Sequence, residues 1–128
     1  MREQGYYSLI QYCPCPARAE SVNIGVLLFS PKHGFLEVRM IETDYSRIFA
    51  MFPEASQYAI DGMKDWITCW IEADQQTVKT KEDLDLFLEA FFNHLRPTPL
   101  RVVVVDDPER KLKELFDELV TMRRNDDE

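Results

Sequence analysis

Apolar residues dominate the first third of the chain, in patterns typical of β-strands. Residues 6–12 are mostly aromatic and aliphatic, and this segment ends where Pro14 and Pro16 prevent a helix or a β-ladder from continuing. Residues 22–29 are apolar at nearly every position, which predicts a central strand with both faces buried. Period-two alternation divides this strand into two faces, Val22, Ile24, Val26 and Leu28 on one and Asn23, Gly25, Leu27 and Phe29 on the other.

A short turn connects this strand to a third one. Residues 30–34 include Pro31 and Gly34, and the glycine can supply the positive φ that such turns need. Residues 35–41 then alternate as a half-exposed strand does. The simplest connection between the two strands is a β-hairpin.

After Glu42 the apolar spacing changes to three and four residues, which predicts a series of helices. The first helix begins at Thr43 or Asp44 and ends before Pro53. The second covers residues 54–73, with Pro53 placed to start it. A polar connector separates it from the next helix.

The third predicted helix begins at Thr80, where Asp83 takes the place of the usual Glu in a capping box. Its apolar residues share one face: Leu84, Phe87, Leu88, Phe91, Phe92 and Leu95.

The end of the chain predicts one more strand and one more helix. Residues 100–105 are a β-branched run of strand length, and Asp107 followed by Pro108 is a helix-start signal. Residues 125–128 are expected to fray. The fold class is therefore α+β, a single domain over residues 1–128 in the order βββαααβα, with a mostly antiparallel sheet of about four strands packed with about four helices.

The charge of the chain is negative and unevenly distributed. The 128 residues include 15 Lys and Arg against 23 Asp and Glu, a formal charge of -8, which argues against a general nucleic-acid binder. Residues 1–41 sum to +1 and residues 42–128 to -9. The acidic helical region is either a solvated surface or a docking surface for a basic partner.

Three cysteines without a signal segment indicate free thiols in a reducing cytoplasm. Cys13 and Cys15 are only half of a metal motif, and no second pair of ligands accompanies them. The sequence also contains no nucleophile elbow, no phosphate loop and no membrane-length apolar run. We therefore predict no catalytic residue, no metal and no cofactor.

The most distinctive stretch contains Arg18, Glu20, Asn23 and Gly25. Asn23 interrupts an apolar strand, and a buried amide must find hydrogen-bond partners, so it is expected to fix the preceding loop. Gly25 removes a side chain, which makes room either for a helix or for a small concavity. The four residues are a candidate binding site, with a purely structural role as the alternative.

These residues also carry a family resemblance. The run from Arg18 to Leu28, together with Tyr7–Tyr12 and the segments at 107–109 and 115–120, resembles the bacterial family called domain of unknown function 3037, DUF3037. The resemblance implies a position beside a HipA-like kinase, in a toxin–antitoxin or defence module. It implies no role for any particular residue.

Two functional hypotheses follow. The first is a cytoplasmic, non-enzymatic interaction module whose partner is a HipA-like kinase or a second copy of itself, with no membrane partner. The second is a small-ligand or nucleotide-binding protein, or a metal-dependent nucleic-acid-processing enzyme, that uses Arg18, Glu20 and Asn23.

Overall fold

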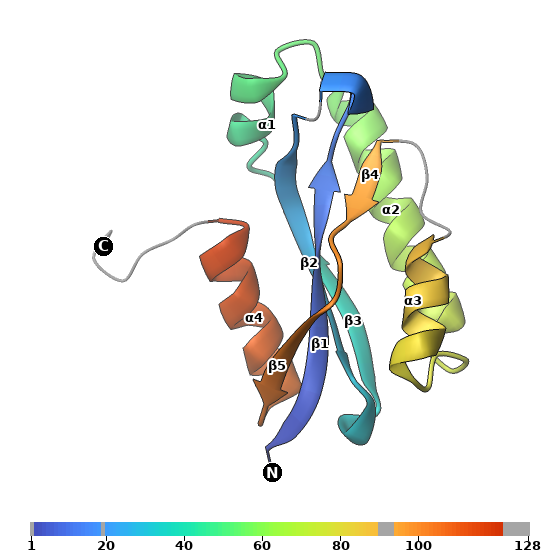
Figure 1. Ribbon diagram of the computed structural model, residues 1–128. Coiled ribbons are helices and arrows are strands. Elements are labelled where there is room, and N and C mark those ends of the chain that lie inside the picture. Colours follow the sequence, from blue (N-terminus) through green and yellow to red (C-terminus); the bar gives the residue numbers. More distant parts are fainter. Residues whose placement is uncertain (1, 19, 90–93, 122–128) are drawn as a thin grey trace.

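The computed structural model describes residues 2–18, 20–89 and 94–121 (Figure 1). They form an antiparallel sheet with helices on both faces, which confirms the predicted α+β class and single domain. The predictions for Phe91, Phe92 and residues 125–128 fall outside the described ranges. None of the described helices is long and apolar enough to cross a membrane.

Across the described residues the sheet contains five strands, one more than expected. They are β1 Glu3–Tyr12, β2 Val22–Ser30, β3 Phe35–Met40, β4 Leu95–Pro97 and β5 Arg101–Val105. Neighbouring strands are antiparallel in the order β3-β2-β1-β4, and β5 also pairs with β1. The long strand β1 therefore carries β4 and β5 one after the other along the same side (Figure 1).

Thr98 bridges the gap between β4 and β5. Its backbone N–H donates to the carbonyl of Leu9 at 2.9 Å, and its hydroxyl oxygen accepts from the Leu9 N–H at 2.8 Å. The buried Ser8 hydroxyl donates to the Thr98 carbonyl at 2.7 Å. The prediction that Leu95 continues a helix is wrong, because Leu95 pairs with Tyr12 in β4.

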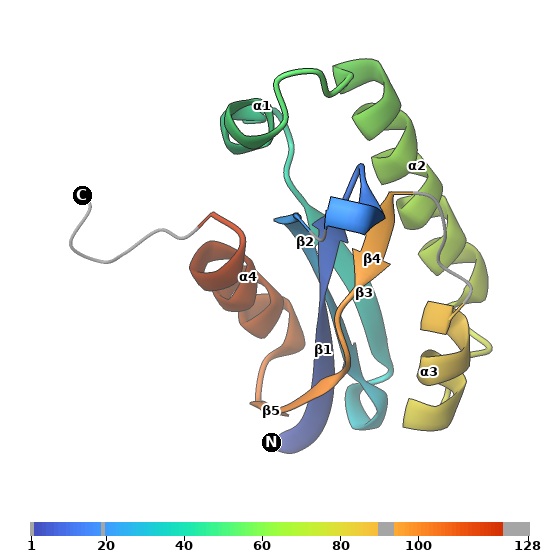
Figure 2. The same cartoon turned by 45° about the horizontal axis from the view of Figure 1, so that its top comes forward.

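In the described part of the chain, four helices pack around the sheet. They are α1 Ser46–Met51, α2 Gln57–Asp74, α3 Lys81–Glu89 and α4 Pro108–Leu119, and short 3-10 turns lie at Pro16–Arg18 and Pro31–His33. Figure 2 shows α4 on one side of the sheet, and α2 and α3 on the other. Each side has its own apolar core, so both faces of β2 are buried, as predicted.

Helix starts follow the predicted side chains in two cases. Asp107 accepts from the Arg110 N–H at 3.3 Å, and Thr80 accepts from the Asp83 N–H at 3.1 Å. Pro53, however, does not start α2. Ser56 caps that helix instead, and its hydroxyl accepts from the Ala59 N–H at 3.2 Å.

A β-bulge in β2 changes which of its residues share a face. Ile10 of β1 pairs with Gly25 but Gln11 pairs with Asn23, so Ile24 is an extra residue in β2. The core under α2 and α3 therefore receives Val22, Ile24, Leu27 and Phe29, and the core under α4 receives Val26 and Leu28. The predicted common face of Val22, Ile24, Val26 and Leu28 is wrong, because strict alternation does not allow for an inserted residue.

Candidate functional site

Arg18 and Glu20 lie on the connection between β1 and β2 and pair with each other. The Arg18 Nε atom is 2.8 Å from Glu20 Oε1, and both side chains are largely exposed, so the pair adds little to stability. They line a cavity of about 530 Å³ between this connection and the segment after α1. Met51, Phe52 and Pro53 form its apolar wall.

Asn23 anchors the end of α4 to the sheet. Its Nδ2 donates to the Leu119 carbonyl at 3.1 Å, and its Oδ1 accepts from Gln11 Nε2 at 2.9 Å. A polar residue in an apolar strand has therefore found partners, as a half-buried amide must. Those partners are β1 and α4 and not the preceding loop, which corrects the prediction for Asn23.

Gly25 makes room for a neighbouring side chain. A Cβ atom at this position would overlap the Met40 sulfur and lie 3.1 Å from the Arg39 carbonyl oxygen. The space left by the glycine is thus filled by Met40 from β3. It is neither a helix contact nor a concavity beside Asn23.

The four predicted residues do not line one cavity. Arg18 and Glu20 lie at the cavity beside the segment after α1, whereas Asn23 lies at another one, at the end of α4, and Gly25 lines neither.

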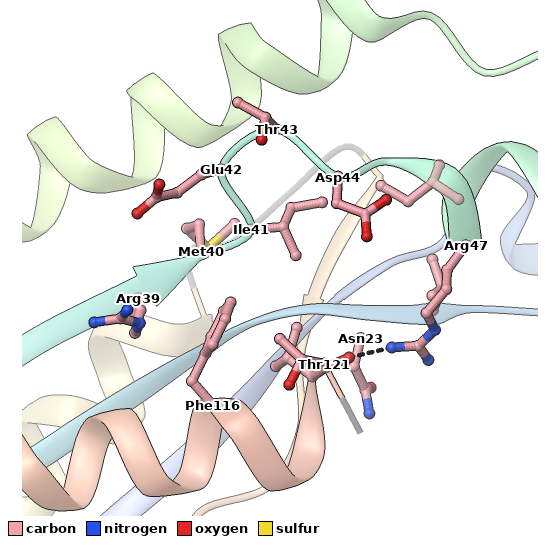
Figure 3. Close-up of a pocket in the computed structure, with 13 residues that line it drawn as sticks. Asn23, Arg39, Met40, Ile41, Glu42, Thr43, Asp44, Arg47, Phe116 and Thr121 are labelled. Carbon is pink, nitrogen blue, oxygen red and sulfur yellow. Dashed lines mark hydrogen bonds between the residues drawn. The ribbon is translucent and has the colours of Figure 1, made fainter. Parts of the chain in front are cut away.

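The cavity at the end of α4 has a volume of about 300 Å³ and contains two arginines (Figure 3). Arg47 comes from α1, and its Nη1 donates to the Val120 carbonyl. Arg39 comes from β3, and its guanidinium carbon is 5.3 Å from the centre of the Phe116 ring. The loop that follows β3 closes the other side (Figure 3).

Two polar side chains of this cavity, Asn23 and Arg47, hold the end of α4. The last carbonyls of a helix have no partner within the helix and carry partial negative charge, so they attract donors. Asn23 and Arg47 supply those donors to Leu119 and Val120. Sequence reasoning missed the bond from Arg47 to the helix end and the contact of Arg39 with Phe116, because both depend on tertiary packing.

Carboxylate and phenol groups nearby also have structural partners. Hydrogen bonds from the Ser46 hydroxyl and N–H hold the pKa of Asp44 below its ordinary value. Burial, together with a hydrogen bond to Asp61, raises the pKa of Tyr45 to about 12. Lys64 donates to the Tyr45 hydroxyl at 2.6 Å. A phenol with a raised pKa keeps its proton, unlike a general base.

A serine–histidine pair also has a structural explanation. Ser30 Oγ lies 2.6 Å from His33 Nδ1, but Ser30 is fully buried and its hydroxyl cannot meet a substrate. Within the described ranges, no three His, Cys, Asp or Glu side chains gather where they could hold a metal ion. The cysteines Cys13, Cys15 and Cys69 are free thiols.

The outer face of α2 presents an exposed stripe with a mixed character. Tyr58, Gly62, Asp65, Cys69 and Glu72 recur at intervals of three and four residues, and all five are exposed. Tyr58 is 90% exposed. The opposite face of the helix packs Ile60, Ile67 and Ile71 into the core.

The outer face of α3 continues the same character. Glu82, Leu86 and Glu89 share one exposed face, and Leu86 is 67% exposed. The two helices meet through aromatic rings, and the ring centres of Trp70 and Phe87 are 4.2 Å apart. We call the exposed residues of the two helices, Tyr58 to Glu72 on α2 and Glu82 to Glu89 on α3, the outer face of the α2–α3 layer.

Comparison with known proteins identifies a family. The model of the family described as Protein of unknown function (DUF3037) matches residues 7–120. No curated protein and no solved structure matches the chain.

Proposed function

The chain belongs to the DUF3037 family, and we propose that it is a non-enzymatic protein-interaction module that binds a partner through the outer face of the α2–α3 layer. The family resemblance adds the class of partner, a HipA-like kinase in a bacterial toxin–antitoxin or defence module. The three free thiols fit a reducing compartment, so the proposal includes a cytoplasmic location.

The observation that carries the proposal is the combination of charge and exposed apolar groups on this face. Residues 57–89 contain eight acidic and three basic residues, whereas α4 has four and three. The acidic excess predicted for the helices thus lies mainly in one layer. Exposed aromatic and aliphatic groups surrounded by acidic side chains are typical of a surface that recognises a partner with basic and apolar groups.

Four of the acidic side chains on this face are available to a partner. Asp65, Glu72, Glu82 and Glu89 are exposed, and within the described part of the chain no hydrogen bond or ion pair engages them. By contrast, Asp61 interacts with Tyr45 and Lys64, and is therefore part of the fold.

Gly62 is an independent reason to place a contact on α2. Glycine in a helix interior is less favourable than alanine by about 1 kcal/mol. Beyond its chain neighbours and the nearby backbone of α2, a Cβ atom at Gly62 would meet no atom of the described residues within 4 Å, so packing among those residues does not require the glycine. The flat surface that it leaves between Tyr58 and Asp65 allows another backbone to approach closely.

The test measures the affinity of the purified chain for the purified HipA-like kinase from the same genome. Asp65→Lys should weaken binding roughly tenfold, because it places like charges against a basic surface. Glu118→Lys, an equal reversal of charge at an exposed site on α4, should leave the affinity unchanged. Equal effects of the two substitutions, or no binding by the wild type, would overturn the proposal.

A further inference from the structure

The two edges of the sheet differ in how they are protected. The edge strand β3 carries the exposed charged residues Glu37 and Arg39. The side-chain amide of Gln75, at the end of α2, also donates to the Leu36 carbonyl of this strand at 3.0 Å. On β5, Val102 is 62% exposed and Val104 58%. Within the described residues, β5 pairs with β1 alone. An unprotected apolar edge of this kind is a template for another strand.

The backbone groups of Val102 and Val104 point away from β1. The N–H and carbonyl of Leu9 both bond to Thr98, so Leu9 directs its backbone toward the β4–β5 side. In an antiparallel strand the direction of the backbone groups alternates from residue to residue. Every second residue before Leu9, namely Tyr7, Gly5 and Glu3, therefore also directs its backbone groups toward the β4–β5 side. Their partners are Val105, Val103 and Arg101. The residues between them, Val102 and Val104, direct their backbone groups outward.

We propose that β5 is a homodimerisation strand, which pairs antiparallel with β5 of a second copy so that Val102 lies opposite Val104 of that copy. The pairing joins two five-stranded sheets into one of ten strands. It is independent of the α2–α3 layer, which remains free for another partner.

The sequence of β5 complements itself in this register. The residues with outward backbone groups, Val102 and Val104, pair with each other twice, and each valine lies beside another valine on the same face. Gln4 and Tyr6 of β1 pair with Val104 and Val102, so they flank the cluster from both copies.

Helix placement permits the same arrangement. At each end of the pairing, Arg101 lies opposite Val105 of the copy. Helix α4 packs on β2 and β3 and against Val105 of β5. Val102 and Val104 nevertheless remain exposed. The formal charge of -8 on each copy opposes association, so we expect a reversible dimer that is favoured by salt.

The first test is sedimentation of the purified full chain at rising concentration and at low and high salt. The mass should move from 15.1 kDa toward twice that value, with a larger dimer fraction at high salt. Val104→Lys should remain monomeric, and Val104→Ile should still dimerise. Leu86→Lys, a matched change at an exposed site on α3, should also still dimerise.

Amide hydrogen exchange tests the register in the wild-type protein, without relying on any variant. The amides of Val102 and Val104 should exchange more slowly as the dimer forms. A wild type that stays monomeric up to several hundred micromolar at high salt overturns the proposal, and so does a dimer that survives Val104→Lys. If these amides are protected only when the kinase is added, the kinase and not a second copy binds the β5 edge. That result would also overturn the proposal.

Discussion

At the scale of single residues, glycines in this protein have two different explanations. The surroundings of Gly25 and Gly5 are full, since a Cβ atom at Gly5 would lie 2.7 Å from Val105 Cγ2. Outside its own helix backbone and chain neighbours, no atom of the described residues lies within 4 Å of a Cβ atom built at Gly62. Packing within the described part of the chain therefore explains the first two glycines but not the third, which we propose serves a partner.

Replacing Gly25 tests its role in packing. Gly25→Ala should lower the free energy of unfolding by about 1 to 3 kcal/mol, because the new methyl group overlaps Met40. The double variant Gly25→Ala with Met40→Ala should lose less than the sum of the two single variants, since the shorter side chain relieves the overlap. Urea denaturation of the four proteins measures this coupling. Strictly additive losses would contradict the assigned contact.

At the scale of elements, the start of α3 shows how a local signal becomes a structural interaction. Asp83 accepts hydrogen bonds from the backbone N–H groups of Lys79 and Thr80, at 3.0 Å and 3.2 Å. The bond from Lys79 is the largest reason why the pKa of Asp83 lies below its ordinary value. The ionised carboxylate is therefore the form that stabilises the helix start.

A pH series tests this contribution. Because the folded-state pKa is lowered, the stabilisation by Asp83 is present above the unfolded pKa of 3.8 and disappears as the pH falls through the folded value. Wild type should exceed Asp83→Asn in stability at pH 7, and the difference should shrink below about pH 4. Urea denaturation at several pH values measures it. A difference that does not change with pH would contradict this account.

Local signals predicted elements better than they predicted contacts. The helix starts at Thr80 and Asp107 and the valine-rich strand β5 could be foreseen, because each depends on neighbouring residues. The bulge at Ile24 and the strand β4 could not. Both depend on pairing with β1, which lies far away in the sequence.

The candidate site shows the same division. The sequence marked Asn23 as a residue that must be hydrogen-bonded, and it is. It did not indicate that α4 would be the partner, nor that Arg47 from α1 would join it there. The outer face of α2 could have been found from the sequence, since Tyr58, Asp65 and Glu72 are seven residues apart.

At the scale of the whole molecule, different surfaces are assigned to different tasks. Helix α4 is held to the sheet by side chains that line the cavity at its end. The outer face of the α2–α3 layer is proposed to bind a partner, and the β5 edge is proposed to bind a second copy. Salt should separate the two interactions, because it screens attraction between an acidic face and a basic partner but also repulsion between two acidic copies.

The affinity of Gly62→Ala for the HipA-like kinase tests the central claim most directly, with urea denaturation of the same variant as its companion. The substitution should raise the free energy of unfolding by about 1 kcal/mol. It should also weaken binding about tenfold, because the added methyl group keeps the partner from close approach. A variant that is more stable and binds as tightly as the wild type would contradict the assignment of this face to a partner.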